Sequence, residues 1–471
     1  MKRDVVDPLA LNPLAAGPIA GAPPLASMRA DPLADEAVAR MLAGATGPHE
    51  MAARVAAINR EIQRWDSNGA LAGWEPGPDT DPRTGAALKD YLAACAALPA
   101  WAEPGSIARA EALFMDMSML SCTLLFCASL PECYVLPDLS AVLHAAGQLE
   151  QHTDYRIRST AAMIFPVMMR GGLTAPAAGG LAQALKVRMI HATIRHLILR
   201  GPVPGAAPLL QAMPPAGGGL YHVLYAHGWD GARDGLPCNQ EQLAYTLLTF
   251  HYVFLRGLRR LGLGLPRADE EAYLHAWNVL GHVLGIERGL MAWTMEEAEA
   301  RFAAFQASGL GDAPRPDPRP ALAAALMREM ANQLPPRLLK PFPVLLTRRL
   351  CGPRAAAALG LDSRVPLASR LLFAAGFGAV RAFDAAVRLF VPGFSISRML
   401  TRVAGYRLVT RFLMDQTRPL RLPEALLGEV AGTLHAWRRD PLAPRWLSRL
   451  EARLAGHPPP AGPGRNDADH R

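Results

Sequence analysis

The chain has 471 residues, of which 51% are hydrophobic and only 7% aromatic, and its formal net charge is +8. Ala, Leu and Arg dominate; they favour helix, whereas the β-branched and aromatic residues of strands are scarce. The composition therefore predicts an all-α fold with a large core and disfavours a strand-rich fold.

The first segment of the chain has no periodic pattern. Residues 1–33 are rich in Pro, Ala and Gly and predict a disordered tail. Lys2 and Arg3 are followed by Asp4 instead of an apolar run, which is not the pattern of a signal peptide. We therefore expect a cytoplasmic protein that is soluble or peripheral to a membrane.

Helical periodicity then recurs along the chain, interrupted by clusters of Gly and Pro. A loop rich in such residues at 74–83 separates the first helices from an apolar stretch at 109–130. Asn239 and Asp269 stand where helices begin and are the expected N-caps. The segments predicted to be helical are 34–65, 89–98, 139–147, 155–169, 181–200, 239–261 and 269–284.

Two blocks of helices are expected. The first, 34–311, is a catalytic core that carries the motifs below, and a Pro-rich break separates it from a second block at 321–455. Residues 456–471 predict a second disordered tail. Between residues 337 and 411 the second block has thirteen Arg or Lys and two Asp. Such a basic block either covers solvated faces or meets an anionic surface.

One stretch of the basic block, 367–390, has a wide apolar face and a narrow charged stripe. The stripe consists of Arg370, Arg381, Asp384 and Arg388. A helix of this kind either packs on a core or lies on a bilayer surface. Core packing is the favoured interpretation, and peripheral membrane contact is the alternative.

The cysteines lack metal-binding or redox spacing, since no CxxC pair occurs. We expect them to be reduced and buried, with disulfides or metal ligation as the alternative. The six are Cys95, Cys122, Cys127, Cys133, Cys238 and Cys351.

His191 lies inside the apolar segment LKVRMIHATIRHLILR. On a helix it shares one face with Val187 and Ile194. A histidine in such a stripe must satisfy two ring nitrogens away from water. Position alone favours a hydrogen-bonded core histidine, and a metal ligand is the alternative.

Arg156 and Thr160 are four residues apart in DYRIRSTAAMIFPVM, so they project together from one helix face. Met163 and Val167 continue that face as an apolar wall. A guanidinium beside such a wall suits the edge of a haem, where it can pair with a propionate. From the pattern alone, an Arg in an ordinary ion pair is the simpler interpretation.

Histidines are concentrated on the predicted buried helices of the middle third of the chain, in greater number than a core needs. Other chemistries lack their motifs, because the sequence has no HxxxH or ExxH pair, no GxSxG and no Walker sequence. The basic stretches lack interleaved aromatics, which disfavours nucleic-acid binding. The histidines concerned are His191, His196, His251, His275 and His282.

Several ordered motifs resemble one family. They are similar to the oxygenases related to rubber oxygenase (latex clearing protein) and the fungal mycophenolic-acid pathway oxygenase. The resemblance implies a globin-like helical core, one haem b and dioxygen chemistry, which in rubber-cleaving members splits a carbon–carbon double bond. The motifs are GQLEQHTDYRIRSTAAMIFPVM, VRMIHATIRHLI, LPCNQEQLAYTLLTFHYVFLRGLRRLGL and AYLHAWNVLGHVLG.

The resemblance also implies roles for single residues. His191 matches the proximal haem ligand, and Arg156 and Thr160 match the Arg and Thr beside the haem. Five further residues also match family positions: His196, Thr249, His251, His275 and His282. For His275 and His282, structural hydrogen bonding is the expected role.

Two departures from the family pattern weaken the expectation of polyisoprene cleavage. Ser159 stands where some rubber-cleaving members have a Lys as a second axial ligand, so a Lys-capped iron is excluded. Those enzymes also have a Glu base just before a glycine, whereas Ala145 and Ala146 precede Gly147 here.

The sequence therefore predicts a haem-b-dependent oxygenase that acts with dioxygen on a hydrophobic isoprenoid, lipid or polyketide-like substrate. Oxidative cleavage of a carbon–carbon double bond is one expected reaction, with Arg156 and Thr160 as catalytic residues and His191 on the iron. A non-catalytic haem- or lipid-binding helical protein is the alternative. The predicted haem pocket consists of Arg156, Thr160, His191, His196, Thr249 and His251.

Overall fold

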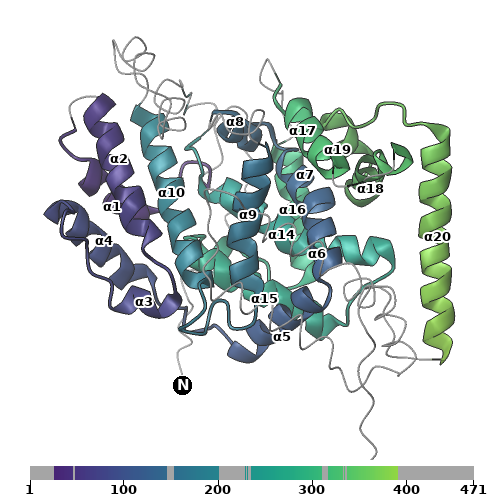
Figure 1. Ribbon diagram of the computed structural model, residues 1–471, viewed down its shortest axis with the longest axis horizontal. Coiled ribbons are helices and arrows are strands. Elements are labelled where there is room, and N and C mark those ends of the chain that lie inside the picture. Colours follow the sequence, from purple (N-terminus) through teal and green to yellow (C-terminus); the bar gives the residue numbers. More distant parts are fainter. Residues whose placement is uncertain are drawn as a thin grey trace, which may run out of the picture.

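The computed structural model describes residues 26–45, 48–145, 153–200, 229, 231, 235–309, 317–332, 334 and 337–390. All regular structure within these residues is helical, which confirms the predicted all-α fold (Figure 1). The expected tail at 456–471, and the part of the basic block after residue 390, lie outside the described residues.

The N-terminal helices lie along one side of the molecule (Figure 1). The segment predicted to be helical over 34–65 is divided into two helices, because Gly44 adopts a left-handed φ of +79° after the first helix and Pro48 begins a second one. The four helices of this region are α1 (Pro32–Leu42), α2 (Pro48–Gln63), α3 (Asn68–Ala72) and α4 (Pro82–Cys95).

The segment before α1 packs on the body from residue 26 onward, whereas residues 1–25 of the predicted tail lie outside the described residues. Asp31 caps α1 and is only 3% exposed. Its carboxylate accepts hydrogen bonds from Nε and Nη2 of Arg188, at 2.5 and 2.7 Å. The backbone N–H of Gln240 donates to the carbonyl of Arg29 at 2.9 Å. Residues 26–33 are therefore fixed to two later helices.

The apolar stretch at 109–130 forms a chain of short helices in the core. Burial raises the pKa of both Cys122 and Cys127 to about 12. The six cysteines all lie among the described residues and form no disulfide with one another; five are buried, as predicted, while Cys238 is half-buried. These helices are α5 (Pro104–Asp116), α6 (Ser118–Leu124), the π-helix η2 (Leu125–Ser129), α7 (Leu130–Cys133) and α8 (Pro137–Ala145).

A close backbone crossing joins α9 (Thr153–Met168) to α10 (Gly180–Arg200). The N–H of Gly180 donates to the carbonyl of Gly172 at 3.0 Å. The side chain of Asn68 holds the same loop, because its Nδ2 donates to the carbonyls of Gly172 and Ala175, each at 2.9 Å. The predicted helices at 155–169 and 181–200 are confirmed, including the stop at the glycines that follow α9.

The crossing leaves no room for a side chain at Gly172. A Cβ there would lie 2.3 Å from the carbonyl oxygens of Pro166 and Val167. We expect Gly172→Ala to lower the free energy of unfolding by about 1–3 kcal/mol, the usual cost of overpacking, as measured by urea denaturation. The matched control is Gly105→Ala in α5, where a Cβ meets nothing within 4 Å. Equal midpoints for the two variants would contradict the close crossing.

Helix α14 crosses the core and packs against α15 and α16, whereas α20 stands at the edge of the molecule (Figure 1). Asn239 is the N-cap of α14, as predicted, and its side chain accepts from Gln242 N–H at 2.9 Å. The prediction for Asp269 is wrong, because Pro266 occupies the N-cap and Asp269 lies in the first turn. These helices are α14 (Gln240–Leu261), α15 (Arg267–Val283), η3 (Arg288–Leu290), α16 (Met295–Gly309), α17 (Arg319–Asn332), η4 (Arg337–Leu339), α18 (Phe342–Cys351), α19 (Pro353–Ala358) and α20 (Leu367–Phe390).

A helix that spans a membrane must be both long and apolar. Among them, no single helix is both long and apolar enough to cross a bilayer. One pair of helices, 104–116 and 120–133, is bent at the break between them and together meets the length and composition of a span, by these two criteria only.

Candidate functional site

The hairpin of α9 and α10 carries most of the predicted site. Arg156 and Thr160 lie on α9 and His191 lies on α10, and the two helices pack against each other. Because Gly180 and Gly172 are hydrogen-bonded at their junction, the helices run in opposite directions from a common end. At 1.5 Å per residue, Thr160 is about 12 Å and His191 about 16 Å from that end. Along the axis of the hairpin, His191 therefore lies at a similar height to the predicted pair of Arg156 and Thr160.

The described side chains of this hairpin form a mixed polar and apolar surface. Thr160 and His191 are half-buried, whereas Phe165 and Val167 are buried. His196 is also half-buried, one turn and a half beyond His191 on α10. The side chains of Arg156, Ser159 and His144 lie outside the described residues.

Two buried arginines, which sequence analysis missed, fix the rotation of α10. Arg188 pairs with Asp31 and also donates to the carbonyl of Val283 at 3.1 Å. One turn after His191, Arg195 donates to Asp35 at 3.0 Å and to the carbonyl of Cys238 at 3.3 Å. The available signal was the spacing, because these charges lie three residues before and four residues after His191 on an otherwise apolar helix.

Helix α14 presents the other two predicted pocket residues in different environments. The hydroxyl of Thr249 donates to the carbonyl of Thr246 at 2.7 Å and lies 2.9 Å from the thiol of Cys133 on α7. Its hydrogen-bonding capacity is thus already used within the core, and a role for Thr249 at a cofactor stays a prediction.

His251 is fully buried, and neither ring nitrogen has a hydrogen-bond partner among the described residues. Burial lowers the pKa of His251 to about 3, so its ring is neutral at ordinary pH. A neutral imidazole with two uncommitted nitrogens is rare in a core. His251 is therefore a buried imidazole whose two ring nitrogens need a partner that the described residues do not supply.

The residues present fit one haem b. A single imidazole can serve as the protein ligand, because the porphyrin supplies the four in-plane nitrogens. His191 offers that imidazole, and Met163, three residues after Thr160 on α9, offers a half-buried apolar side chain. Among the described residues, no three His, Cys, Asp or Glu side chains gather as a site for a bare metal ion.

His275 and His282 lie on α15, around Trp101. Nε2 of His275 accepts the backbone N–H of Glu103 at 2.9 Å. The ring centroids of His275 and His282 are 5.7 and 6.0 Å from that of Trp101, in edge-on geometry. The structural hydrogen bonding that the sequence favours is therefore found for His275.

Glu111 on α5 is a buried carboxyl that sequence analysis missed. It is 3% exposed and accepts the N–H of Gly171, in the loop that follows α9, at 2.7 Å. Burial raises the pKa of Glu111 to about 7, although hydrogen bonds from the amides of residues 171–173 lower it. The carboxyl thus fastens α5 to the loop that joins the two site helices.

This raised pKa has a consequence for stability. Because the folded pKa of Glu111 exceeds the ordinary value of 4.5, its contribution is present at low pH and is lost as the pH rises from about 4.5 to about 7. We expect Glu111→Gln to remove this part of the pH dependence. Urea midpoints of both proteins at about pH 5 and about pH 8 test it. Parallel changes in the two proteins would contradict the raised pKa.

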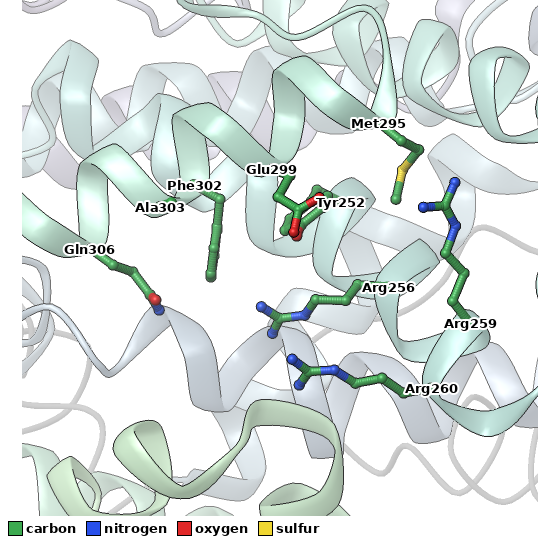
Figure 2. A pocket seen from close by; sticks show the side chains of 9 residues that line it. All are labelled: Tyr252, Arg256, Arg259, Arg260, Met295, Glu299, Phe302, Ala303 and Gln306. Atoms are coloured by element: carbon green, nitrogen blue, oxygen red, sulfur yellow. The ribbon is translucent and has the colours of Figure 1, made fainter.

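A pocket of about 520 Å³ lies between α14 and α16, apart from the predicted site (Figure 2). Beside it, the buried carboxylate of Glu132 accepts from Arg256 at 2.5 Å and from Gln306 at 3.1 Å. The pocket includes none of the predicted haem-pocket residues. It is lined by Tyr252, Arg256, Arg259, Arg260, Met295, Glu299, Phe302, Ala303 and Gln306.

Comparisons with known proteins agree on one family. A family model described as the catalytic domain of the ER-bound oxygenases mpaB/B' and rubber oxygenase matches residues 123–389. Rubber oxygenase from Streptomyces sp. (strain K30) is 25% identical over 324 residues, which are 68% of this chain and 69% of that protein. A solved structure of latex clearing protein in the closed state has a similar fold, with a TM-score of 0.54 and 19% identity over 87% of this chain and 90% of that one.

Proposed function

Because this chain belongs to the family of the ER-bound oxygenases mpaB/B' and rubber oxygenase, we propose that it is a haem-b oxygenase for a hydrophobic substrate. The family makes it a dioxygen-dependent oxidoreductase. The haem proposal is carried by one observation: the matched region contains the α9–α10 hairpin, which holds His191 at the level of Thr160.

The hairpin residues would hold the haem, which when bound supplies an iron that activates dioxygen. The neutral imidazole of His191 is the proposed protein ligand, since only a deprotonated ring nitrogen can donate to a metal. Thr160 and Arg156 are proposed to hold the haem edge, with the guanidinium of Arg156 pairing with a propionate. His196 and His251 are proposed to complete the pocket.

The substrate is proposed to be an isoprenoid, a lipid or a polyketide tail. Phe165 and Val167 are buried on α9, and apolar side chains of this kind exclude water and bind apolar chains. Oxidative cleavage of a carbon–carbon double bond is the proposed reaction. Ser159 replaces the Lys of some rubber-cleaving relatives, so polyisoprene itself is not the proposed substrate.

The division of the chain into a core at 34–311 and a block at 321–455 remains a proposal. The family model runs from 123 to 389 and therefore crosses the predicted break at 312–320. We propose that α17 to α20 form part of the oxygenase unit, because α17 packs against α9 and α18 packs against η2.

Two measurements on the purified full chain test the proposed function. A Soret band, with haem b identified by the pyridine haemochrome, is the expected result for the cofactor. Dioxygen uptake that rises above the protein-only rate with apolar alkenes is the expected result for the activity. A protein without a Soret band would contradict the haem proposal, and a Soret band without dioxygen uptake would favour the non-catalytic haem-binding alternative.

A further inference from the structure

One corner of the molecule exposes an apolar surface, which we call the α20 face. Of the eight large hydrophobic side chains that are exposed among the described residues, four lie here. η4 and α20 contact each other, so the four form one region. They are Leu338, Leu367, Leu371 and Leu372, which are 55%, 66%, 61% and 43% exposed. A cluster of this kind in a water-exposed position marks an interaction surface.

Only a narrow edge of α20 packs on the protein. Phe373 meets Phe342 of α18 with ring centroids 5.3 Å apart, and the guanidinium of Arg349 lies 4.2 Å from the ring centroid of Phe377. Ser369 is buried on the same edge, four residues before Phe373. The rest of the described part of α20 is exposed, and the helix stands at the edge of the molecule (Figure 1). Core packing, the favoured sequence interpretation, therefore holds for this edge alone.

The charges around the α20 face are positive with one exception. Among the described residues from 337 to 379, Asp362 is the single acid. Arg364 and Arg370 are exposed directly beside the leucines. The full set of basic residues in this segment is Arg337, Lys340, Arg348, Arg349, Arg354, Arg364 and Arg370. An apolar face with a cationic rim is complementary to a surface that is apolar inside and anionic outside.

We propose that the α20 face docks flat on an anionic lipid bilayer. The apolar part of the helix, 367–379, is shorter than the roughly 20 residues of a bilayer span, so it lies in the interface. A second copy of this chain is a poorer partner, because two such faces would bring like charges together. The proposal extends the proposed function, since a membrane is where an isoprenoid or lipid substrate would be found.

Flotation of the full chain with vesicles tests the proposal without any need for turnover. We expect the protein to float with phosphatidylcholine vesicles that contain about a third phosphatidylserine, and to float less with phosphatidylcholine alone. Raising the salt from about 0.05 M to about 0.5 M should release it. Leu371→Asp should lower the vesicle-bound to free ratio about tenfold or more, because an exposed leucine that would insert into the bilayer is replaced by a charge.

The matched control is Leu33→Asp, since Leu33 is 49% exposed on α1, outside the α20 face. We expect this variant to float like the unmodified protein. Protein that stays at the bottom with anionic vesicles would overturn the proposal. It would also be overturned if Leu371→Asp, but not Leu33→Asp, lowered the melting temperature or changed the sedimenting mass, because the face would then be covered by protein. Neither outcome affects the haem measurements, so the two proposals fail separately.

Discussion

We expect His191→Ala to lose its bound haem almost completely. The variant removes the proposed bond between protein and iron, and even outer-shell partners of a metal site contribute about 10–100-fold to affinity. The haem content per purified chain, measured by the pyridine haemochrome, should therefore fall by more than about tenfold. The melting temperature of the haem-free protein should change little, since His191 is half-buried and does not carry the core.

Two variants separate ligation from packing. His196→Ala removes a half-buried imidazole from the same helix, five residues further on, and should keep most of the haem. His191→Gly leaves a cavity that free imidazole can enter, so added imidazole should restore a Soret band. If His191→Ala kept an unchanged Soret band, or if His196→Ala lost as much haem as His191→Ala, the ligand assignment would be wrong.

The helices that carry the site are those that the sequence predicts best. The helices predicted at 181–200 and 239–261 are found at Gly180–Arg200 and Gln240–Leu261, because Gly and Pro breakers flank both segments. The break within 34–65 was not predicted, because Gly44 and Pro48 interrupt a helical pattern that otherwise continues. A periodic pattern does not report a short interruption when both halves bury the same kind of face.

The site itself was only partly predictable from the sequence. His191 stood out as a polar residue on an apolar helix, but its level relative to Thr160 depends on the crossing of Gly172 and Gly180. The role of Arg188 was hidden, because its partner Asp31 is 157 positions away in a segment without helical pattern. Local patterns cannot identify a buried ion pair when its two members belong to unrelated parts of the sequence.

The buried ion pair of Arg188 and Asp31 should contribute strongly to the stability of the fold. Arg188→Met should lower the free energy of unfolding by about 3–5 kcal/mol, the usual cost of removing one member of a buried pair. The side chains of Arg188 and Asp31 are only 8% and 4% exposed, so the variant leaves the Asp31 carboxylate without its counter-charge and away from water. Burial lowers the pKa of Arg188, but the hydrogen bonds and charge of Asp31 raise it above its ordinary value. The shift in urea midpoint measures the loss.

Two comparisons show whether the cost comes from an unpaired charge. Arg267→Met breaks a pair with Glu271 in which Arg267 is 76% exposed, and should leave the urea midpoint almost unchanged, because water screens exposed ion pairs. Arg188→Met combined with Asp31→Asn should recover much of the stability, because the double variant buries no charge and an Asn still caps α1. Equal costs for Arg188→Met and Arg267→Met would contradict a buried anchor.

Added haem should restore part of the stability that Arg188→Met loses, because a ligand that binds only the folded state shifts the unfolding equilibrium. Arg188 precedes the proposed ligand His191 by one turn of α10, so the same helix would be held by the haem.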